Sequence, residues 1–113
     1  MSEMLTLEKF EEASEIVKQV TSETKLMYSE FLSNQTGNKV YLKPENMQLT
    51  GAYKLRGAYY KISTLSPEER EKGLITASAG NHAQGVAYAT IQVPFGMKIA
   101  LLSSTNCWFC VKS

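Results

Sequence analysis

The chain has 113 residues, of which 43% are hydrophobic and 20% are charged, and its formal net charge is +1. This composition is typical of a single globular unit, and a charge so close to zero gives no electrostatic reason to expect nucleic-acid binding. The longest apolar runs, such as residues 99–102, are far shorter than the roughly 20 residues that span a bilayer. We therefore expect neither a nucleic-acid partner nor a membrane partner.

The N-terminus lacks the basic start and apolar core of a signal peptide, because the chain turns acidic by Glu8. Two cysteines and one histidine are too few for a zinc site, so no metal is expected. Cys107 and Cys110 form a C-x-x-C pair close to Ser113, whereas a redox motif would open a helix. We interpret the pair as inert thiols in a cytoplasmic, reducing compartment.

Hydrophobic periodicity predicts the first elements of the chain. Apolar residues at i, i+3, i+4 and i+7 spacing predict an amphipathic helix from Thr6 to about Val20, with Thr6 as its cap. The turn-forming residues 34–38 predict a loop. Residues 39–43 predict a short strand that Pro44 ends.

Helix signals continue through the middle of the chain. A second amphipathic helix is predicted from near Gly51 to Leu65. Residues 66–69 read Ser-Pro-Glu-Glu, the pattern of a capping box with proline at the first helical position. We expect the helix that they begin to end at Gly73, in the left-handed region.

The last part of the chain alternates between strand and helix patterns. The predicted order is a buried strand, a tight turn, a helix and a second strand, at residues 74–77, 78–80, 81–91 and 97–102. This order makes a βαβ unit, whose crossover implies parallel strands. The predicted class is therefore α/β, a parallel sheet with flanking helices. The helix is expected to turn four side chains inward, those of Ala83, Val86, Ala87 and Thr90.

Two segments carry the residues of chemical interest. Lys54 lies among small and aromatic residues at the start of the second helix, although a lysine in such a place is more often a solvated surface charge. The turn at 78–82 reads Ser-Ala-Gly-Asn-His, and its small residues and helix-start amides suit an anion. An ordinary turn with Ser78 as a cap fits these residues equally well. His82 by itself is better interpreted as a packing or hydrogen-bonding residue than as a general base.

Taken together, the two segments closely resemble a known family. They run from Lys43 to Ala58, KPENMQLTGAYKLRGA, and from Ser78 to Gly85, SAGNHAQG. Both are similar to segments of threonine ammonia-lyases (threonine dehydratases), which are fold type II pyridoxal-phosphate enzymes. The resemblance covers residues 24–102. It implies that residues 1–113 are an N-terminal fragment of a catalytic domain with the tryptophan synthase β-like fold.

The resemblance also implies roles for individual residues. Lys54 would hold pyridoxal 5′-phosphate covalently, with Tyr53 as an aromatic wall and Asn81 at the 3′-oxygen of the cofactor. The implied reaction is dehydration and deamination of L-threonine, with L-serine as a further substrate, to a 2-oxo acid and ammonia. The full-length parent would be a homo-oligomer. The substrate carboxylate would be bound by the turn Ser78, Ala79, Gly80, Asn81 and His82.

The chain departs from the family pattern at two places. Ala52 stands where the family's lysine motif usually has serine, and the tail 103–113 is not family-like. The family's glycine-rich loop for the cofactor phosphate would lie beyond this length, so we expect the isolated chain to be a truncated, inactive piece. Serine racemase or another lyase of the same fold is a near alternative. An alternative of another class is a non-catalytic remnant that assembles with a partner.

Overall fold

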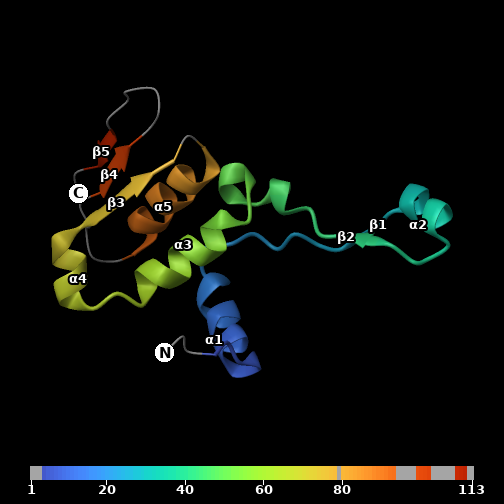
Figure 1. The fold of residues 1–113 in the computed structure, drawn as a ribbon, viewed down its shortest axis with the longest axis horizontal. Helices are drawn as coiled ribbons and strands as arrows, with labels where there is room; N and C mark the ends of the chain where they lie inside the picture. Colours follow the sequence, from blue (N-terminus) through green and yellow to red (C-terminus); the bar gives the residue numbers. More distant parts are fainter. Residues whose placement is uncertain (1–3, 79, 94–98, 103–108, 112–113) are drawn as a thin grey trace.

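The computed structural model describes residues 4–78, 80–93, 99–102 and 109–111. Figure 1 shows a body of helices and a small sheet, from which one arm projects. Its elements in chain order are α1 (Leu7–Val17), β1 (Met27–Tyr28), α2 (Glu30–Thr36), β2 (Tyr41–Leu42), the 3-10 turns η1 (Glu45–Met47) and η2 (Leu49–Gly51), α3 (Lys54–Ser63), α4 (Pro67–Lys72), β3 (Leu74–Ala77), α5 (Asn81–Gln92), β4 (Ile99–Leu102) and β5 (Phe109–Val111).

The predicted βαβ unit is present as β3, α5 and β4. The prediction that β3 is buried was wrong, because only Thr76 of its four residues is buried. β3 pairs with β4 in parallel, with Leu74 opposite Ile99 and Ala77 opposite Leu102. β5 then pairs with β4 in the antiparallel direction, so the sheet order is β3-β4-β5 and the sheet is mixed. The α/β class is confirmed. Residues 97 and 98 of the predicted second strand lie outside the described residues.

Local signals place the starts of α1 and α4 correctly. Thr6 caps α1 by accepting a hydrogen bond from the Lys9 amide at 3.5 Å. The capping box of α4 is complete, because Ser66 Oγ accepts from the Glu69 amide at 3.2 Å and the Glu69 carboxylate accepts from the Ser66 amide at 2.9 Å. Gly73 has the predicted positive φ of 76°, but its ψ of −174° lies outside the left-handed helical region. Among the described residues, no helix is both long and apolar enough to cross a membrane.

The hydrophobic core lies between α1, α3 and α5. Leu55 is the largest fully buried side chain, with none of its surface exposed. The buried face of α5 consists of Gly85, Val86, Ala89 and Thr90, so the predicted inward positions Val86 and Thr90 are confirmed. Ala87 packs against the core, as predicted, whereas Ala83 does not belong to the core or to the residues packed against it, so that position was wrong. Both of those alanines are only half-buried. The core cluster consists of Val17, Val20, Leu55, Ala58, Tyr59, Ile62, Val86, Ala89 and Val93.

The segment β1–α2–β2 forms the arm that extends away from the body (Figure 1). Its two strands are antiparallel, and the rings of Tyr28 and Tyr41 meet edge to face at 5.4 Å between centroids. The predicted strand at 39–43 is therefore confirmed only at its centre. The predicted loop at 34–38 was partly wrong, because α2 continues to Thr36 and ends at Gly37 with φ 68°. The arm raises the radius of gyration to 17.1 Å, against about 13 Å for a compact chain of this length.

Candidate functional site

Lys54 is the first residue of α3, and its side chain is exposed. The helix begins three residues later than the sequence predicts. Thr50 and Gly51 cause the delay, because their φ values of 68° and 69° are incompatible with a continuous right-handed helix. Tyr53 occupies the N-cap position and makes no side-chain capping bond. Its ring is also exposed, at 63% of its surface.

The second candidate segment links β3 to α5. Gly80, rather than Ser78, is the N-cap of α5, and no side chain caps this helix. Ser78 Oγ instead accepts a hydrogen bond from the Gly80 amide at 3.2 Å. The interpretation of Ser78 as an ordinary helix cap was therefore wrong. Asn81 and His82 are exposed on the first turn of α5, and Ala79 lies outside the described residues.

The two helices that carry the candidate residues begin differently from the others. In α1, α2 and α4 a side-chain oxygen accepts a bond from a helix-start amide, from Thr6, Ser29 and Ser66 respectively. Neither α3 nor α5 has such a side-chain cap. The first amides of a helix carry partial positive charge and favour anions when no side chain occupies them. The starts of α3 and α5 are therefore suited to bind anionic groups.

A close contact at Gly85 brings these two helix starts together. A Cβ atom placed on Gly85 would lie 3.2 Å from the Leu55 nitrogen, 3.4 Å from the Leu55 Cα and 3.4 Å from the Lys54 carbonyl carbon. The backbone of α5 thus rests directly on the peptide that follows Lys54. Gly85 is four positions after Asn81, which corresponds to about one turn, or roughly 6 Å, of helix. Lys54 and the turn at 78–82 therefore belong to one region.

His82 contributes to a different feature of this region. A hollow of about 240 Å³ lies between α3, β3 and α5, and His82 lines it together with Lys61 and Thr76. This volume is smaller than the roughly 300–1,000 Å³ of most ligand pockets. Neither Lys54 nor Ser78 lines the hollow. His82 therefore lines a feature that Lys54 and Ser78 do not reach.

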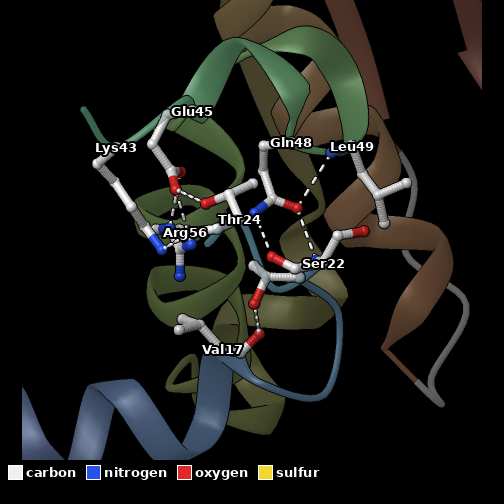
Figure 2. A network of polar contacts seen from close by, with 9 residues as sticks. Val17, Ser22, Thr24, Lys43, Glu45, Gln48, Leu49 and Arg56 are labelled. Atoms are coloured by element: carbon white, nitrogen blue, oxygen red, sulfur yellow. Dashed lines mark hydrogen bonds and ion pairs between the residues drawn. The ribbon is translucent and has the colours of Figure 1, made fainter. Parts of the chain in front are cut away.

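A polar network fixes the segment that leads into Lys54 (Figure 2). Arg56 donates to both carboxylate oxygens of Glu45, from Nε to Oε2 and from Nη2 to Oε1, each at 2.9 Å. Thr24 Oγ1 donates to Glu45 Oε1 at 2.7 Å, and Lys43 Nζ donates to the Thr24 carbonyl. The bonds from Arg56 are the main reason why the pKa of Glu45 falls from 4.5 to about 2. Burial opposes this shift, and the bond from Thr24 adds to it.

Gln48 forms the second half of the network. Its side chain is almost fully buried, and its Oε1 accepts from the Ser22 amide at 2.7 Å and from the Leu49 amide at 3.0 Å. Its Nε2 donates to the Ser22 carbonyl at 2.9 Å. Figure 2 shows these bonds joining the connector after α1 to the turns that precede α3. The approach to Lys54 is thus held from two sides, by Glu45 and by Gln48.

Comparison with known proteins identifies the family. Residues 17–106 match the family model described as pyridoxal-phosphate dependent enzyme. The chain belongs to this family. It is 57% identical over 86 residues to the L-threonine ammonia-lyase of Thermotoga maritima, a match that covers 76% of the chain and 21% of that relative. The chain spans about a fifth to a third of the length of the curated relatives it matches.

Solved structures of this pyridoxal-phosphate family agree with the predicted fold. The processed form of threonine deaminase isoform 2 from Solanum lycopersicum superimposes with a TM-score of 0.73 at 40% identity, over 92% of this chain and 29% of that one. Maize serine racemase also gives a TM-score of 0.73, at 32% identity over 84% of this chain and 29% of that one. The fold type II pyridoxal-phosphate fold is therefore confirmed.

Several residues that shape this region of the pyridoxal-phosphate fold were missed from the sequence. Glu45, Gln48 and Arg56 lie in the motif that carries the resemblance, but no role was predicted for them. Their partners are far away in the chain, as for Gln48 and Ser22, which are 26 positions apart, and no local spacing rule reveals such pairs. Gly85 had a weak signal, since a glycine inside a predicted helix indicates close packing or a helix end.

Proposed function

We propose that this chain forms part of an enzyme that converts L-threonine, and also L-serine, to a 2-oxo acid and ammonia with pyridoxal 5′-phosphate. The observation that carries the proposal is the contact between Gly85 and the Lys54–Leu55 peptide. It puts the backbone of an exposed lysine against α5 about one helical turn after Asn81, where this uncapped helix begins. The family match and the relatives named L-threonine ammonia-lyase support the same conclusion.

The proposed roles follow from what each residue offers. Lys54 holds the cofactor through its side-chain amine. It is exposed at the start of α3, where a ligand can reach it. The exposed ring of Tyr53 lies beside it in the sequence and provides an apolar wall. Asn81, exposed on the first turn of α5, donates its side-chain amide to the cofactor's 3′-oxygen.

The turn at 78–82, which includes Ala79 and Gly80, binds the substrate carboxylate. Its amides carry no side-chain cap, so the positive end of α5 is available to a carboxylate. Ser78 adds a hydroxyl that is already held in place by the Gly80 amide. His82 closes the turn on the side of the hollow that it lines. When bound, the cofactor supplies an electron sink for the bond broken at the substrate's α-carbon.

The residues present fit pyridoxal phosphate in two respects. They provide a reachable primary amine and anion-binding helix starts in one region. We further propose that the whole enzyme acts on a small amino acid as a homo-oligomer in the cytoplasm. The proposals on substrate and assembly rest on the resemblance to threonine ammonia-lyases, and the one on location rests on the interpretation of Cys107 and Cys110 as reduced thiols.

A second candidate is serine racemization, which the likeness to maize serine racemase favours. Dehydration and racemization both begin with a proton taken from the α-carbon, so the lysine and the carboxylate turn would serve either reaction. The two candidates differ in the product that they release. A protein of another class, a non-catalytic subunit, would form no bond between Lys54 and the cofactor.

The first experiment is a labelling of the chain. The protein is mixed with pyridoxal phosphate, reduced with borohydride, digested, and mapped by mass spectrometry. We expect the label on Lys54 and its loss in Lys54→Ala. A label on Lys43 or Lys61 in place of Lys54 would contradict the assignment.

The second experiment distinguishes the candidate reactions. The matching segment of the Thermotoga maritima L-threonine ammonia-lyase is replaced by this chain, and the chimera is given L-threonine or L-serine. Release of a 2-oxo acid from L-threonine supports the dehydratase. Formation of D-serine without a 2-oxo acid would support the racemase. An inactive chimera whose Lys54 takes no label would support the non-catalytic alternative.

A further inference from the structure

Two glycines in the body occupy helix interiors but have different surroundings. A Cβ on Gly57, in α3, would meet no atom within 4 Å. A Cβ on Gly85, in α5, would meet the Leu55 nitrogen at 3.2 Å, closer than side-chain carbons ordinarily approach. Glycine in a helix interior costs about 1 kcal/mol relative to alanine. Close packing accounts for a glycine at position 85, whereas nothing among the described residues obstructs a side chain at position 57.

The atoms that Gly85 meets belong to the main chain. They are the nitrogen and Cα of Leu55 and the carbonyl carbon of Lys54. A flexible side chain could rotate away from an added methyl group, but a helix backbone can only move as a unit. Leu55 is fully buried, so its own packing also resists that movement. A methyl group at position 85 would therefore displace the start of α3 relative to α5.

Small buried residues on both helices surround the contact at Gly85. Ala89, one turn after Gly85, is fully buried, and Ala58 is buried on the facing helix α3. Small residues along both helices keep the axes close together. Gly85 is also one turn after Asn81, where α5 begins. The crossing thus lies between the start of α3, which carries Lys54, and the start of α5, which follows the turn at 78–82.

We propose that Gly85 is a positioning residue that sets the separation between the Lys54 amine and the turn at 78–82. The proposal rests on the function proposed above for these two elements. The three described atoms nearest to a Cβ placed on Gly85 all belong to the backbone of Lys54 and Leu55. Its effect is transmitted through the first turn of α3, which moves when α5 is forced away. Displacing reacting groups by about 1 Å can cost about 100-fold in rate.

The test compares Gly85→Ala with Gly57→Ala, because both replace a helical glycine by alanine and only the first creates a close contact. Each 113-residue chain is mixed with pyridoxal phosphate, reduced with borohydride, and mapped. Lys61, exposed on the same helix, provides an internal reference, since general unfolding would alter both lysines together. We expect the ratio of Lys54 to Lys61 labelling to fall about 3- to 10-fold in Gly85→Ala. This is less than the 100-fold loss given above, because the added methyl group should move α3 by a few tenths of an ångström rather than by about 1 Å. Gly57→Ala should keep the parent ratio.

A second readout does not depend on the cofactor. The Leu55 amide is followed by nuclear magnetic resonance and hydrogen exchange in the same three chains. Gly85→Ala should shift its resonance and speed its exchange, and Gly57→Ala should not. If the parent chain shows no preference for Lys54 over Lys61, the assignment of Lys54 as the cofactor-binding lysine fails, while the Leu55 amide still tests the position of α3. Two outcomes would overturn the proposal. One is an unchanged Leu55 amide in folded Gly85→Ala. The other is an unchanged labelling ratio in Gly85→Ala when the parent chain prefers Lys54.

If Gly85→Ala loses helical signal, the comparison is repeated in trimethylamine N-oxide, which favours the folded state.

Discussion

Arg56 holds both oxygens of the Glu45 carboxylate, and the two residues are eleven positions apart in the sequence. Arg56 is in the first turn of α3, two residues after Lys54, and Glu45 begins η1. The ion pair therefore ties the helix that carries the candidate lysine to the turn that precedes it. Two-point pairing of this kind fixes direction as well as distance. The pKa of Arg56 is raised by the same bonds that lower that of Glu45.

The first prediction concerns this pair and pH. Because the pKa of Glu45 is about 2 in the folded chain and 4.5 is its ordinary value, the pair stabilises the fold above about pH 5. That contribution is lost as the pH falls through 4.5 towards 2. We expect about 1–2 kcal/mol at neutral pH, less than the full shift implies because solvent reaches the pair. Urea unfolding of the parent and Glu45→Gln between pH 2.5 and 7 measures it.

Glu45→Gln should lower stability at pH 7 and leave it nearly unchanged at pH 2.5. Glu8 and Glu68 also have lowered pKa values, but both side chains are fully exposed at helix starts, where solvent screens their charge. Glu68→Gln is therefore the control, and it should follow the parent curve. Equal pH dependence in the parent and in Glu45→Gln would refute this assignment.

The second prediction concerns Gln48, which makes three hydrogen bonds from a nearly buried position. Gln48→Ala should lower the free energy of unfolding by about 1–3 kcal/mol, since it leaves the Leu49 amide and both main-chain groups of Ser22 without this partner. Gln35→Ala, at an exposed position of α2, is the matched control and should change stability by less than about 0.5 kcal/mol. Equal urea midpoints for the two variants would show that the Gln48 bonds add no stability.

The third prediction concerns the backbone before Lys54. Thr50 has φ 68°, and its Oγ1 is buried without a hydrogen-bond partner in the described structure. A β-branched residue with positive φ costs about 1–2 kcal/mol, and replacing it with glycine removes this cost. Part of the stability gained is lost again, because glycine has more conformational freedom in the unfolded chain. Thr50→Gly should therefore stabilise the chain by about 1 kcal/mol in thermal or urea unfolding.

Gly51 gives the reciprocal test. Its φ is 69°, and an added Cβ would meet nothing within 4 Å. Gly51→Ala should therefore destabilise the chain by about 1–2 kcal/mol through backbone conformation alone. If both substitutions changed stability in the same direction, backbone strain at this turn would not be the cause.

The fourth prediction separates the roles proposed for Ser78 and Asn81. In the chimera, Ser78→Ala should raise the KM for threonine by about 5- to 150-fold, equivalent to about 1–3 kcal/mol for a hydrogen bond to a carboxylate, with cofactor affinity nearly unchanged. Asn81→Ala should instead lower kcat and shift the absorbance of the bound cofactor. Titration with pyridoxal phosphate and then with threonine measures both effects. A cofactor-affinity defect in Ser78→Ala with a normal KM would reverse the assignment.

The sequence predicts well those features whose causes are local. The capping box at Ser66 and Glu69 and the parallel pairing of β3 with β4 were both predicted, because each depends on neighbouring residues or on a connection rule. The inward face of α5 was assigned correctly at Val86 and Thr90 but not at Ala83, and the buried Gly85 and Ala89 were missed. Small residues occur at 83, 85, 87 and 89, so hydrophobicity gives little contrast around the helix. The partner helix α3 decides which of them is buried.

The candidate site shows the same division. Lys54 and the turn at 78–82 are proposed from the sequence because a family motif surrounds each of them. The contact at Gly85 and the bonds of Gln48 depend on segments that are brought together only by the fold. Periodicity cannot reveal them, since each partner is distant in the sequence.

The separation of the arm from the body has a consequence for cutting and reassembly. The core cluster draws its residues from 17–20 and 55–93, and none of them comes from the arm. The exposed turn at Gly37 and Asn38 directly follows α2, which lies at the far end of the arm (Figure 1). A protease that cleaved there would leave α1 attached to the body by Val17 and Val20 in the core and by the bonds from Gln48 to Ser22. Separately produced pieces 1–37 and 38–113 should accordingly recombine as a complementing pair.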